Sequence, residues 1–227
     1  MNPNPSSLNS IVLGLILLTA WFLILYISGM VLYQKWPYQK EWMRKLLHIG
    51  TGPVILIAWI TSIPRTINLG IGILTILGIL VNYRLMLMPT IEAIDRRSYG
   101  TLAYALAVTI LVWLYWPKEF TAIMAGLMVM GFGDGLAGLL GSTFSSPCWR
   151  VWGQRKSIIG TVTMFVVSIM VLVILSTLSS IPINYRGIMN LAVIATILEQ
   201  LAISGWDNLI IPLIISYLWQ VSILPLD

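Results

Sequence analysis

Long apolar stretches separated by short polar segments are the feature that most constrains this chain. Of its 227 residues, 58% are hydrophobic and only 9% are charged, whereas soluble domains carry about 25% charged residues. A helix needs roughly 20 apolar residues to cross a membrane, and stretches of about this length recur along the sequence. The sequence therefore predicts an all-α, polytopic integral membrane protein with a single domain over residues 1–227.

About eight membrane-spanning helices are expected, with seven as the alternative. Their predicted ranges are 8–33, 46–63, 67–88, 99–116, 120–140, 157–178, 187–203 and 208–223. The last two are short, so it stays open whether they form one re-entrant hairpin. Pro53 is expected to kink the second helix. Residues 142–155 contain Trp149 and Trp152 and are expected to be a loop at the membrane interface.

The cations divide unequally between the two sides of the predicted bundle. One side collects Lys35, Lys40, Arg44, Lys45, Arg84, Arg96, Arg97, Arg150, Arg155 and Lys156, and the other collects Arg65, Lys118 and Arg186. Because cytoplasmic loops are enriched in Lys and Arg, the first side is expected in the cytoplasm and both termini outside. The net charge of +5 is thereby explained by topology, and nucleic acid is not expected as a partner.

Several common kinds of site are excluded by the sequence. The single cysteine, Cys148, excludes an internal disulfide and a cysteine-based zinc cluster, and the single histidine, His48, excludes a multi-histidine metal site. There is no GxxxxGK[ST] pattern, which excludes a P-loop. Gly133, Gly135 and Gly138 match GxGxxG, but no strand precedes them and no acidic residue follows at about twenty positions, so a dinucleotide site is not expected.

One stretch places a charge inside an apolar segment. Asp134 lies within Gly131-Phe-Gly-Asp-Gly-Leu-Ala-Gly-Leu-Leu-Gly141, and a carboxylate at membrane depth indicates a functional site by default. Glycines beside it let the backbone approach a ligand closely. The alternative is that these glycines serve tight helix packing of the small-xxx-small kind. The aspartate among them favours a site.

A second polar cluster begins the sixth predicted helix. Arg155 and Lys156 precede Ser157, and Gly160 follows. The free N–H groups and the dipole of a helix N-terminus favour phosphate. We therefore expect a phosphate site here, with Asp134 handling a metal ion. Taken alone, Lys156 is better explained as a positive-inside anchor.

The predicted topology brings further polar residues to the same face of the membrane. Glu199 lies in an apolar segment and needs a partner. Asp207 and Asn208 form either a helix cap or a contact to metal or nucleotide. Five basic residues are expected on the same face. They either contact substrate or phosphate, or else they flank the helices and bind anionic lipid head groups. These residues are Arg44, Lys45, His48, Arg96 and Arg97. Such convergence of charges indicates a site more strongly than any single residue.

Five segments carry a family resemblance when they are taken together. They are Glu41-Trp-Met-Arg-Lys-Leu-Leu-His48, Asp95-Arg-Arg-Ser-Tyr-Gly-Thr101, Gly131-Phe-Gly-Asp-Gly-Leu-Ala-Gly138, Arg155-Lys-Ser-Ile-Ile-Gly-Thr161 and Asp207-Asn-Leu-Ile-Ile-Pro212. They resemble the phytol kinase branch of the polyprenol kinase family, which includes dolichol kinase and is related to the CDP-diacylglycerol synthases. Residues 1–40 lie outside the resemblance. Ile159 stands where dolichol kinases tend to have an acidic residue, which disfavours dolichol.

The resemblance implies an integral membrane kinase that moves the terminal phosphate of CTP, or of another nucleoside triphosphate, to an isoprenoid alcohol such as phytol. It implies catalytic roles for Asp134, Lys156 and Asp207, and Mg²⁺ held by Asp134, Glu199 or Asp207. It implies nucleotide contacts from Gly131, Gly133, Gly135, Ala137, Gly138, Gly141, Arg155, Lys156, Ser157, Gly160 and Asn208. Expected partners are the prenol, the nucleotide and membrane lipids. The active face is expected on the cytoplasmic side of a bacterial inner or thylakoid membrane.

Two other functional classes stay open. A phosphatidate cytidylyltransferase-like enzyme would also use CTP but would release pyrophosphate. A small membrane transporter would also place carboxylates and glycines where helices are interrupted. The polar residues of this chain are predicted to gather at one face rather than at the midplane, which disfavours transport.

Overall fold

The computed structural model describes residues 7–35, 40–85, 99–203 and 205–223, with side chains of the second helix described from Ile49 onward. The described elements are α1 (Leu8–Lys35), α2 (Lys40–Ile60), α3 (Arg65–Leu85), α5 (Gly100–Tyr115), α6 (Phe120–Met128), the π-helix η1 (Val129–Asp134), α7 (Gly135–Thr143), β1 (Cys148–Val151), β2 (Gln154–Ser157), α8 (Ile158–Leu178), α9 (Tyr185–Leu201) and α10 (Asp207–Ser222).

The described part of the chain is a helical bundle, which confirms the predicted all-α polytopic fold. Counted with α6, η1 and α7 as one continuous rod, it contains eight helical rods. Four segments are long and apolar enough to cross a membrane, namely Leu8–Leu32, Arg65–Leu85, Phe120–Thr143 and Ile158–Leu178. The bundle packs these rods against shorter apolar helices.

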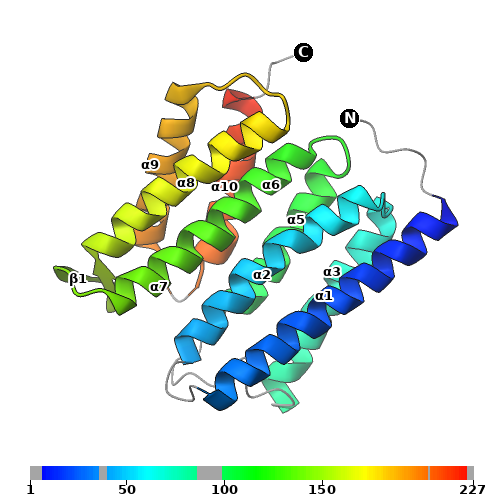
Figure 1. Ribbon diagram of the computed structural model, residues 1–227, viewed down its shortest axis with the longest axis horizontal. Coiled ribbons are helices and arrows are strands. Elements are labelled where there is room, and N and C mark those ends of the chain that lie inside the picture. Colours follow the sequence, from blue (N-terminus) through cyan, green and yellow to red (C-terminus); the bar gives the residue numbers. More distant parts are fainter. Residues whose placement is uncertain (1–6, 36–39, 86–98, 204, 224–227) are drawn as a thin grey trace.

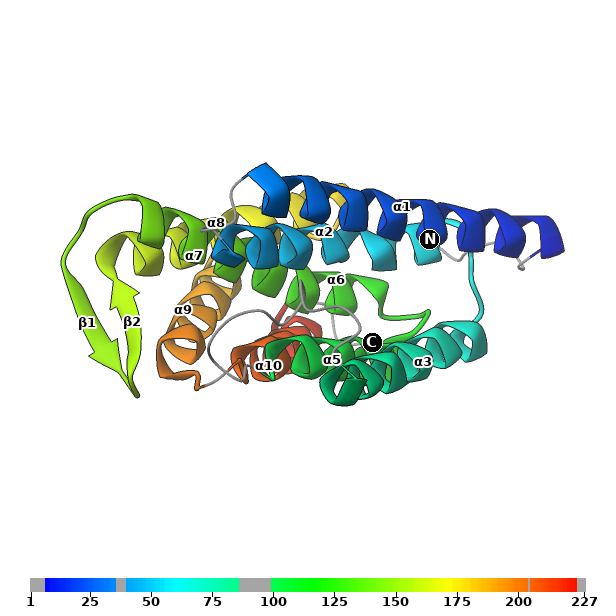
Figure 2. The same cartoon turned by 90° about the horizontal axis from the view of Figure 1, so that it is seen from below.

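The helices form two layers with α6 between them. Figure 2 shows α1 and α2 on one side and α3, α5 and α10 on the other. The core lies around α6, whose residues Ala122–Leu127 are all buried. Gly126 allows α10 to approach, because a Cβ there would lie 2.3 Å from the Pro212 carbonyl oxygen. This rod, which continues into η1 and α7, is therefore the centre of the fold.

The N-terminal helix packs on the rest of the bundle although it lies outside the family resemblance. The Trp21 indole Nε1 donates to the Gly50 carbonyl of α2 at 2.7 Å. At Gly14 a Cβ would come within 2.3 Å of the Thr61 hydroxyl oxygen. These contacts fix α1 along α2, as Figure 1 shows.

The predicted helix boundaries need two corrections. The second helix begins at Lys40, not at residue 46, so the basic segment before its apolar part is helical. The fifth continues to Thr143, not to residue 140, and contains the π-helical turns Val129–Asp134. Figure 1 also shows α9 and α10 as two separate helices that run in opposite directions between the same two ends of the bundle. Within the described chain this arrangement favours eight spans over seven.

A β-hairpin replaces the loop expected over residues 142–155. Strand β1 pairs antiparallel with β2, with Trp149 opposite Lys156 and Val151 opposite Gln154. Its two-residue turn has positive φ at both Trp152 (50°) and Gly153 (78°), the arrangement that two-residue hairpins favour. The usual sequence signal for such a turn is Asn-Gly or Asp-Gly. Because Trp stands in the first position, the pattern did not predict the hairpin.

The hairpin offers a direct test of the predicted orientation. Cys148, the only thiol of the chain, is exposed on β1. If the hairpin lies in the cytoplasm, a membrane-impermeant maleimide will label Cys148 in inside-out vesicles but not in intact cells. A Cys148→Ser variant controls for unspecific labelling. Labelling of intact cells would reverse the orientation.

Candidate active site

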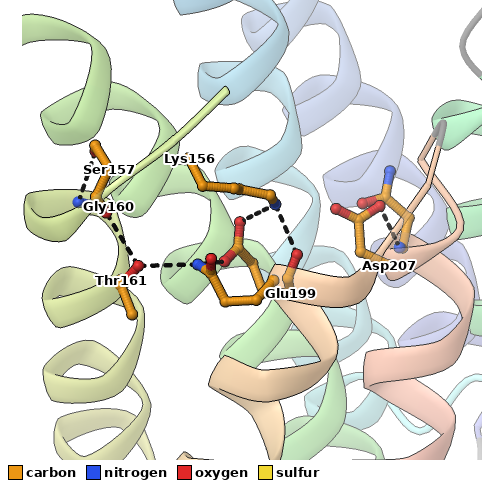
Figure 3. Close-up of polar contacts among 8 residues, drawn as sticks. Lys156, Ser157, Gly160, Thr161, Glu199 and Asp207 are labelled. Carbon is orange, nitrogen blue, oxygen red and sulfur yellow. Dashed lines mark hydrogen bonds and ion pairs between the residues drawn. The ribbon is translucent and has the colours of Figure 1, made fainter. Parts of the chain in front are cut away.

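A buried ion pair lies where β2, α8 and α9 meet. The Lys156 ammonium nitrogen is 2.5 Å from Glu199 Oε1 and 2.6 Å from the Glu199 backbone carbonyl oxygen. Each of the two side chains is 9% exposed. Figure 3 shows the lysine extending from the strand toward the last turn of α9. The carboxylate that the sequence left in need of a partner is therefore paired with the expected phosphate-binding lysine.

The local structure explains why Lys156 turns inward. Side chains alternate between the two faces of a strand, so neighbours on β2 point in opposite directions. Lys156 is buried, whereas Arg155 before it is exposed and donates to the Cys148 sulfur at 3.2 Å. Ser157 after it is also buried, because it is the N-cap of α8. The Arg155 side chain therefore does not lie beside the Lys156 side chain, and its nucleotide contact stays a prediction.

Two polar side chains that the sequence analysis did not single out complete the cluster. Gln200 Nε2 donates to Glu199 Oε2 at 2.7 Å and to Thr161 Oγ1 at 2.9 Å. Thr161 Oγ1 in turn donates to the Ser157 carbonyl at 3.0 Å. These bonds tie the last turn of α9 to the first turn of α8 (Figure 3). The sequence indicated Gln200 only as a second polar residue beside Glu199. It did not indicate the contact between Gln200 and Thr161, because the two residues are 39 positions apart.

The N-terminus of α8 is already hydrogen-bonded within the protein. Ser157 is its N-cap, and the side chain accepts from the Gly160 N–H at 3.2 Å. The N–H groups of Ile158 and Ile159 reach the Pro147 carbonyl at 3.1 Å and the Ser146 hydroxyl at 3.5 Å. The expected helix start at Ser157 is confirmed to within one residue. The backbone phosphate site expected there, however, has its first N–H groups occupied by protein acceptors.

Asp134 is buried, with 7% of its surface exposed, and it ends the π-helical segment. π-Bulges inside α-helices occur frequently at functional sites. The π-helix packs against α2, α8, α9 and α10, so this carboxylate lies in the middle of the bundle. Nine residues separate it from the end of α7, about 14 Å of helix. Asp134 therefore lies well inside its rod, whereas the sequence predicted that the polar residues would gather at one face of the membrane.

Several glycines of the motif serve the contact between helices. A Cβ at Gly141 would lie 2.7 Å from the Ser157 hydroxyl oxygen and 3.1 Å from the Gly160 Cα. A Cβ at Gly133 would lie 2.7 Å from the Met164 sulfur. The packing alternative thus describes Gly133 and Gly141 in the structure, and their nucleotide contacts stay a prediction. Gly131, Gly135 and Ala137 are buried in the same rod, and Gly138 is partly exposed.

Asp207 and Asn208 lie at the start of α10, but neither is its N-cap. The N-cap is Trp206, without a side-chain cap bond, and within the first turn the Asp207 carboxylate accepts from the Asn208 N–H at 3.1 Å. The Asn208 amide instead donates to the Gly100 carbonyl at 2.9 Å and fastens α10 to the beginning of α5. Asn208 is 8% exposed, and its side chain is satisfied by this structural bond. Its predicted nucleotide contact remains untested.

The other predicted substrate and metal residues are only partly described. Arg96 and Arg97 lie outside the described residues, as do the side chains of Arg44, Lys45 and His48. Among the described residues no three His, Cys, Asp or Glu side chains gather into a metal-binding group. The structure places Glu199 with Lys156 and Gln200, and a metal role for Glu199, Asp134 or Asp207 stays a prediction.

Comparison with known proteins identifies two relatives. The chain is 38% identical over 176 residues to a protein named phytol kinase from Synechocystis sp., and the alignment covers 76% of each chain. It is 28% identical over 197 residues to phytol kinase 1, chloroplastic, from Arabidopsis thaliana, which covers 77% of this chain and 64% of that protein. No protein-family model matches the chain, and no solved structure matches it.

The resemblance noted in the sequence is confirmed by these relatives. The cyanobacterial alignment spans three quarters of both proteins at well over 30% identity, and the described chain has the helical membrane architecture that the resemblance implied. The chain therefore belongs to the phytol kinase family.

Proposed function

We propose that this protein is a membrane-embedded kinase that transfers the terminal phosphate of a nucleoside triphosphate, CTP by preference, to the hydroxyl group of phytol or a similar isoprenoid alcohol. The observation that carries the proposal is kinship, because both relatives are named phytol kinase. The buried Lys156–Glu199 pair supports it, since a cation held at a helix end is the kind of group that a phosphate donor requires.

The reaction places modest demands on the protein. The alcohol oxygen bonds to the terminal phosphorus, the bond from that phosphorus to the nucleoside diphosphate breaks, and the alcohol proton leaves to a carboxylate or to solvent. Catalysis of such transfers rests almost entirely on positioning and on neutralising phosphate charge. A few charged side chains, fixed in position at the membrane boundary, are therefore sufficient for catalysis.

Lys156 is the residue that we assign to the phosphates. Its ammonium group has three N–H donors, and the Glu199 carboxylate and carbonyl accept two of them. The third remains to donate to a phosphate oxygen, while Glu199 holds the side chain in place. Because the first N–H groups of α8 bond to Pro147, Ser146 and Ser157, we assign the phosphate contact to this side chain and not to the helix backbone.

A divalent metal ion fits the carboxylates of this chain. Mg²⁺ is usually bound through one or two carboxylates together with the phosphates of the substrate, so a cluster of three is not required. Glu199 is engaged at both oxygens by Lys156 and Gln200. We assign the metal to Asp134, a buried carboxylate flanked by Gly133 and Gly135, together with Asp207. When bound, the metal would offset charge on the phosphate oxygens.

The test is to incubate the purified enzyme with phytol and CTP labelled on either the α or the γ phosphate. Recovery of the γ label in a lipid product is the expected result. Transfer of the α label would assign the protein to nucleotidyl transfer instead. If neither label reaches lipid, and ATP and UTP are also inactive as donors, the kinase proposal is rejected and the transporter hypothesis is favoured.

The alcohol is expected to be long. Its binding is driven by apolar burial, which contributes about 0.8 kcal/mol per CH₂ group, and the exposed apolar surfaces of the helices face lipid. Phytol should therefore be phosphorylated far more efficiently than isopentenol, by at least about a thousandfold in kcat/KM, because more than ten carbons distinguish them. Equal efficiency for the two alcohols would contradict the proposal that apolar burial drives binding of the alcohol.

Thr161 is expected to position the ion pair through Gln200. Thr161→Val keeps the shape of the side chain but removes the hydroxyl group that accepts from Gln200 and donates to Ser157. Of the two hydrogen bonds removed, the one from Gln200 is the one that connects to the ion pair. Its loss corresponds to about 1 kcal/mol, so kcat should fall roughly fivefold. Thr161→Ser retains the hydroxyl and should stay close to the wild type. If both variants lose the same activity, the methyl group and not the hydroxyl is responsible.

A further inference from the structure

The turn and the outer face of the β1–β2 hairpin lie outside the site described above, although Lys156 on β2 belongs to that site. The hairpin is held at the boundary of the membrane. Only residues 144–147 separate it from the end of α7, and α8 begins directly after β2. Both helices belong to segments long and apolar enough to cross a membrane. Four residues of strand extend about 13 Å, so the hairpin cannot move far from the lipid head groups. Figure 2 shows it turned away from the direction of α7 and α8, across the end of the bundle.

The outer face of the hairpin carries two arginines directly opposite each other. Arg150 pairs with Arg155 in the register of the two strands, and both side chains are exposed. Like charges opposed across a strand pair are destabilising. The sequence contains no Asp or Glu between Asp134 and Glu199, so no acidic residue of the hairpin compensates them. Two neighbouring guanidinium groups match the geometry of a phosphate anion.

The tip of the hairpin presents a tryptophan under backbone strain. Trp152 is 70% exposed and has a φ of 50°, a conformation that is unusual for a bulky residue. Glycine would suit this position better, and it already occupies the next one. A large aromatic side chain kept at such a position indicates a function for the side chain. Tryptophan is typical of the head-group level of membranes.

We propose that this hairpin is a docking element for anionic phospholipid head groups of the membrane that holds the protein. Arg150 and Arg155 bind the phosphate, and Trp152 enters the interfacial layer beside it. The chemistry is shared by any phosphate anion, but the covalent position of the hairpin at the ends of two membrane helices selects lipid. The proposal does not rest on the kinase activity.

The experiment measures lipid binding to the purified full-length protein in detergent by native mass spectrometry. The probes are phosphatidylglycerol and phosphatidylcholine with identical acyl chains. Wild-type protein is expected to prefer phosphatidylglycerol. The double variant Arg150→Gln/Arg155→Gln is expected to lose about thirtyfold in affinity for it, the factor that corresponds to about 1 kcal/mol for each of two cations at an anionic surface. Its affinity for phosphatidylcholine should not change.

A matched control removes two exposed cations elsewhere. Lys118 and Arg186 are exposed outside the hairpin, before α6 and in the first turn of α9, and Lys118→Gln/Arg186→Gln should keep the phosphatidylglycerol preference. Equal loss in both double variants, or retained preference in the hairpin variant, would overturn the proposal. A further measurement adds pyrophosphate as a soluble competitor of phosphatidylglycerol. Displacement of phosphatidylglycerol by equimolar pyrophosphate would assign the arginine pair to a soluble ligand and also overturn it.

Trp152→Gly separates docking from folding. The turn conformation suits glycine, so the melting temperature should be unchanged or higher, while affinity for phosphatidylglycerol falls severalfold. A large drop in melting temperature with unchanged lipid affinity would show that the tryptophan serves the fold and would remove it from the docking element.

Discussion

Asp134→Asn is expected to reduce phosphate transfer about a thousandfold or more, the upper range for removing one electrostatic group from an active site. Asp134 is buried in the rod at the centre of the fold, where a charge is costly unless it serves a purpose. The amide keeps the volume of the side chain but removes the charge that would hold a divalent metal. The protein should therefore still insert, purify and keep its melting temperature.

The measurement is turnover of phytol with CTP across a magnesium titration, for both enzymes. A parallel variant is Asp207→Asn, because Asp207 is the other carboxylate that we assign to the metal, and it is only partly buried. If both variants lose activity and need more magnesium, the two carboxylates share the metal. Near-normal turnover of Asp134→Asn at ordinary magnesium would remove Asp134 from the site and leave the glycine-rich segment as helix packing.

Breaking the Lys156–Glu199 pair is expected to affect stability as strongly as catalysis. Both side chains are 9% exposed, and removing one partner of a buried ion pair costs about 3–5 kcal/mol because the other charge stays buried and unpaired. Lys156→Ala and Glu199→Ala should therefore each lower the melting temperature. The weakened nucleotide binding that the proposed phosphate contact implies for Lys156→Ala will be measured together with this loss of stability.

A double variant separates the two effects. Lys156→Met/Glu199→Leu replaces both charges with apolar side chains, an exchange that is often neutral or stabilising at buried pairs. Its melting temperature should return toward that of the wild type. Its activity should stay absent, because no ammonium group remains for the phosphates. Recovery of both stability and activity would show that the ion pair has only a structural role, and that Lys156 does not bind the phosphates.

The positions of the helices followed from the sequence because hydrophobicity acts locally. An apolar segment such as the predicted range 157–178 must become a helix in lipid, where every backbone polar group needs an internal partner, and α8 covers Ile158–Leu178. The expected helix at 99–116 likewise corresponds to α5, Gly100–Tyr115. The beginning of α2 was placed too late because its first turns are polar and basic, and hydropathy does not distinguish a polar helix from a loop.

The sequence alone determined the class of protein, the buried charge at Asp134 and the family segments, since each depends only on residue types and short spacings. Only the tertiary structure decided that Lys156 meets Glu199, that Gln200 and Thr161 support them, and that Gly141 lies against Gly160. The paired residues lie 43 positions apart, and hydropathy carries no information about which helices pack together. The alternation of side chains along β2, which buries Lys156 and exposes Arg155, required a hairpin whose turn residue Trp152 gives no turn signal.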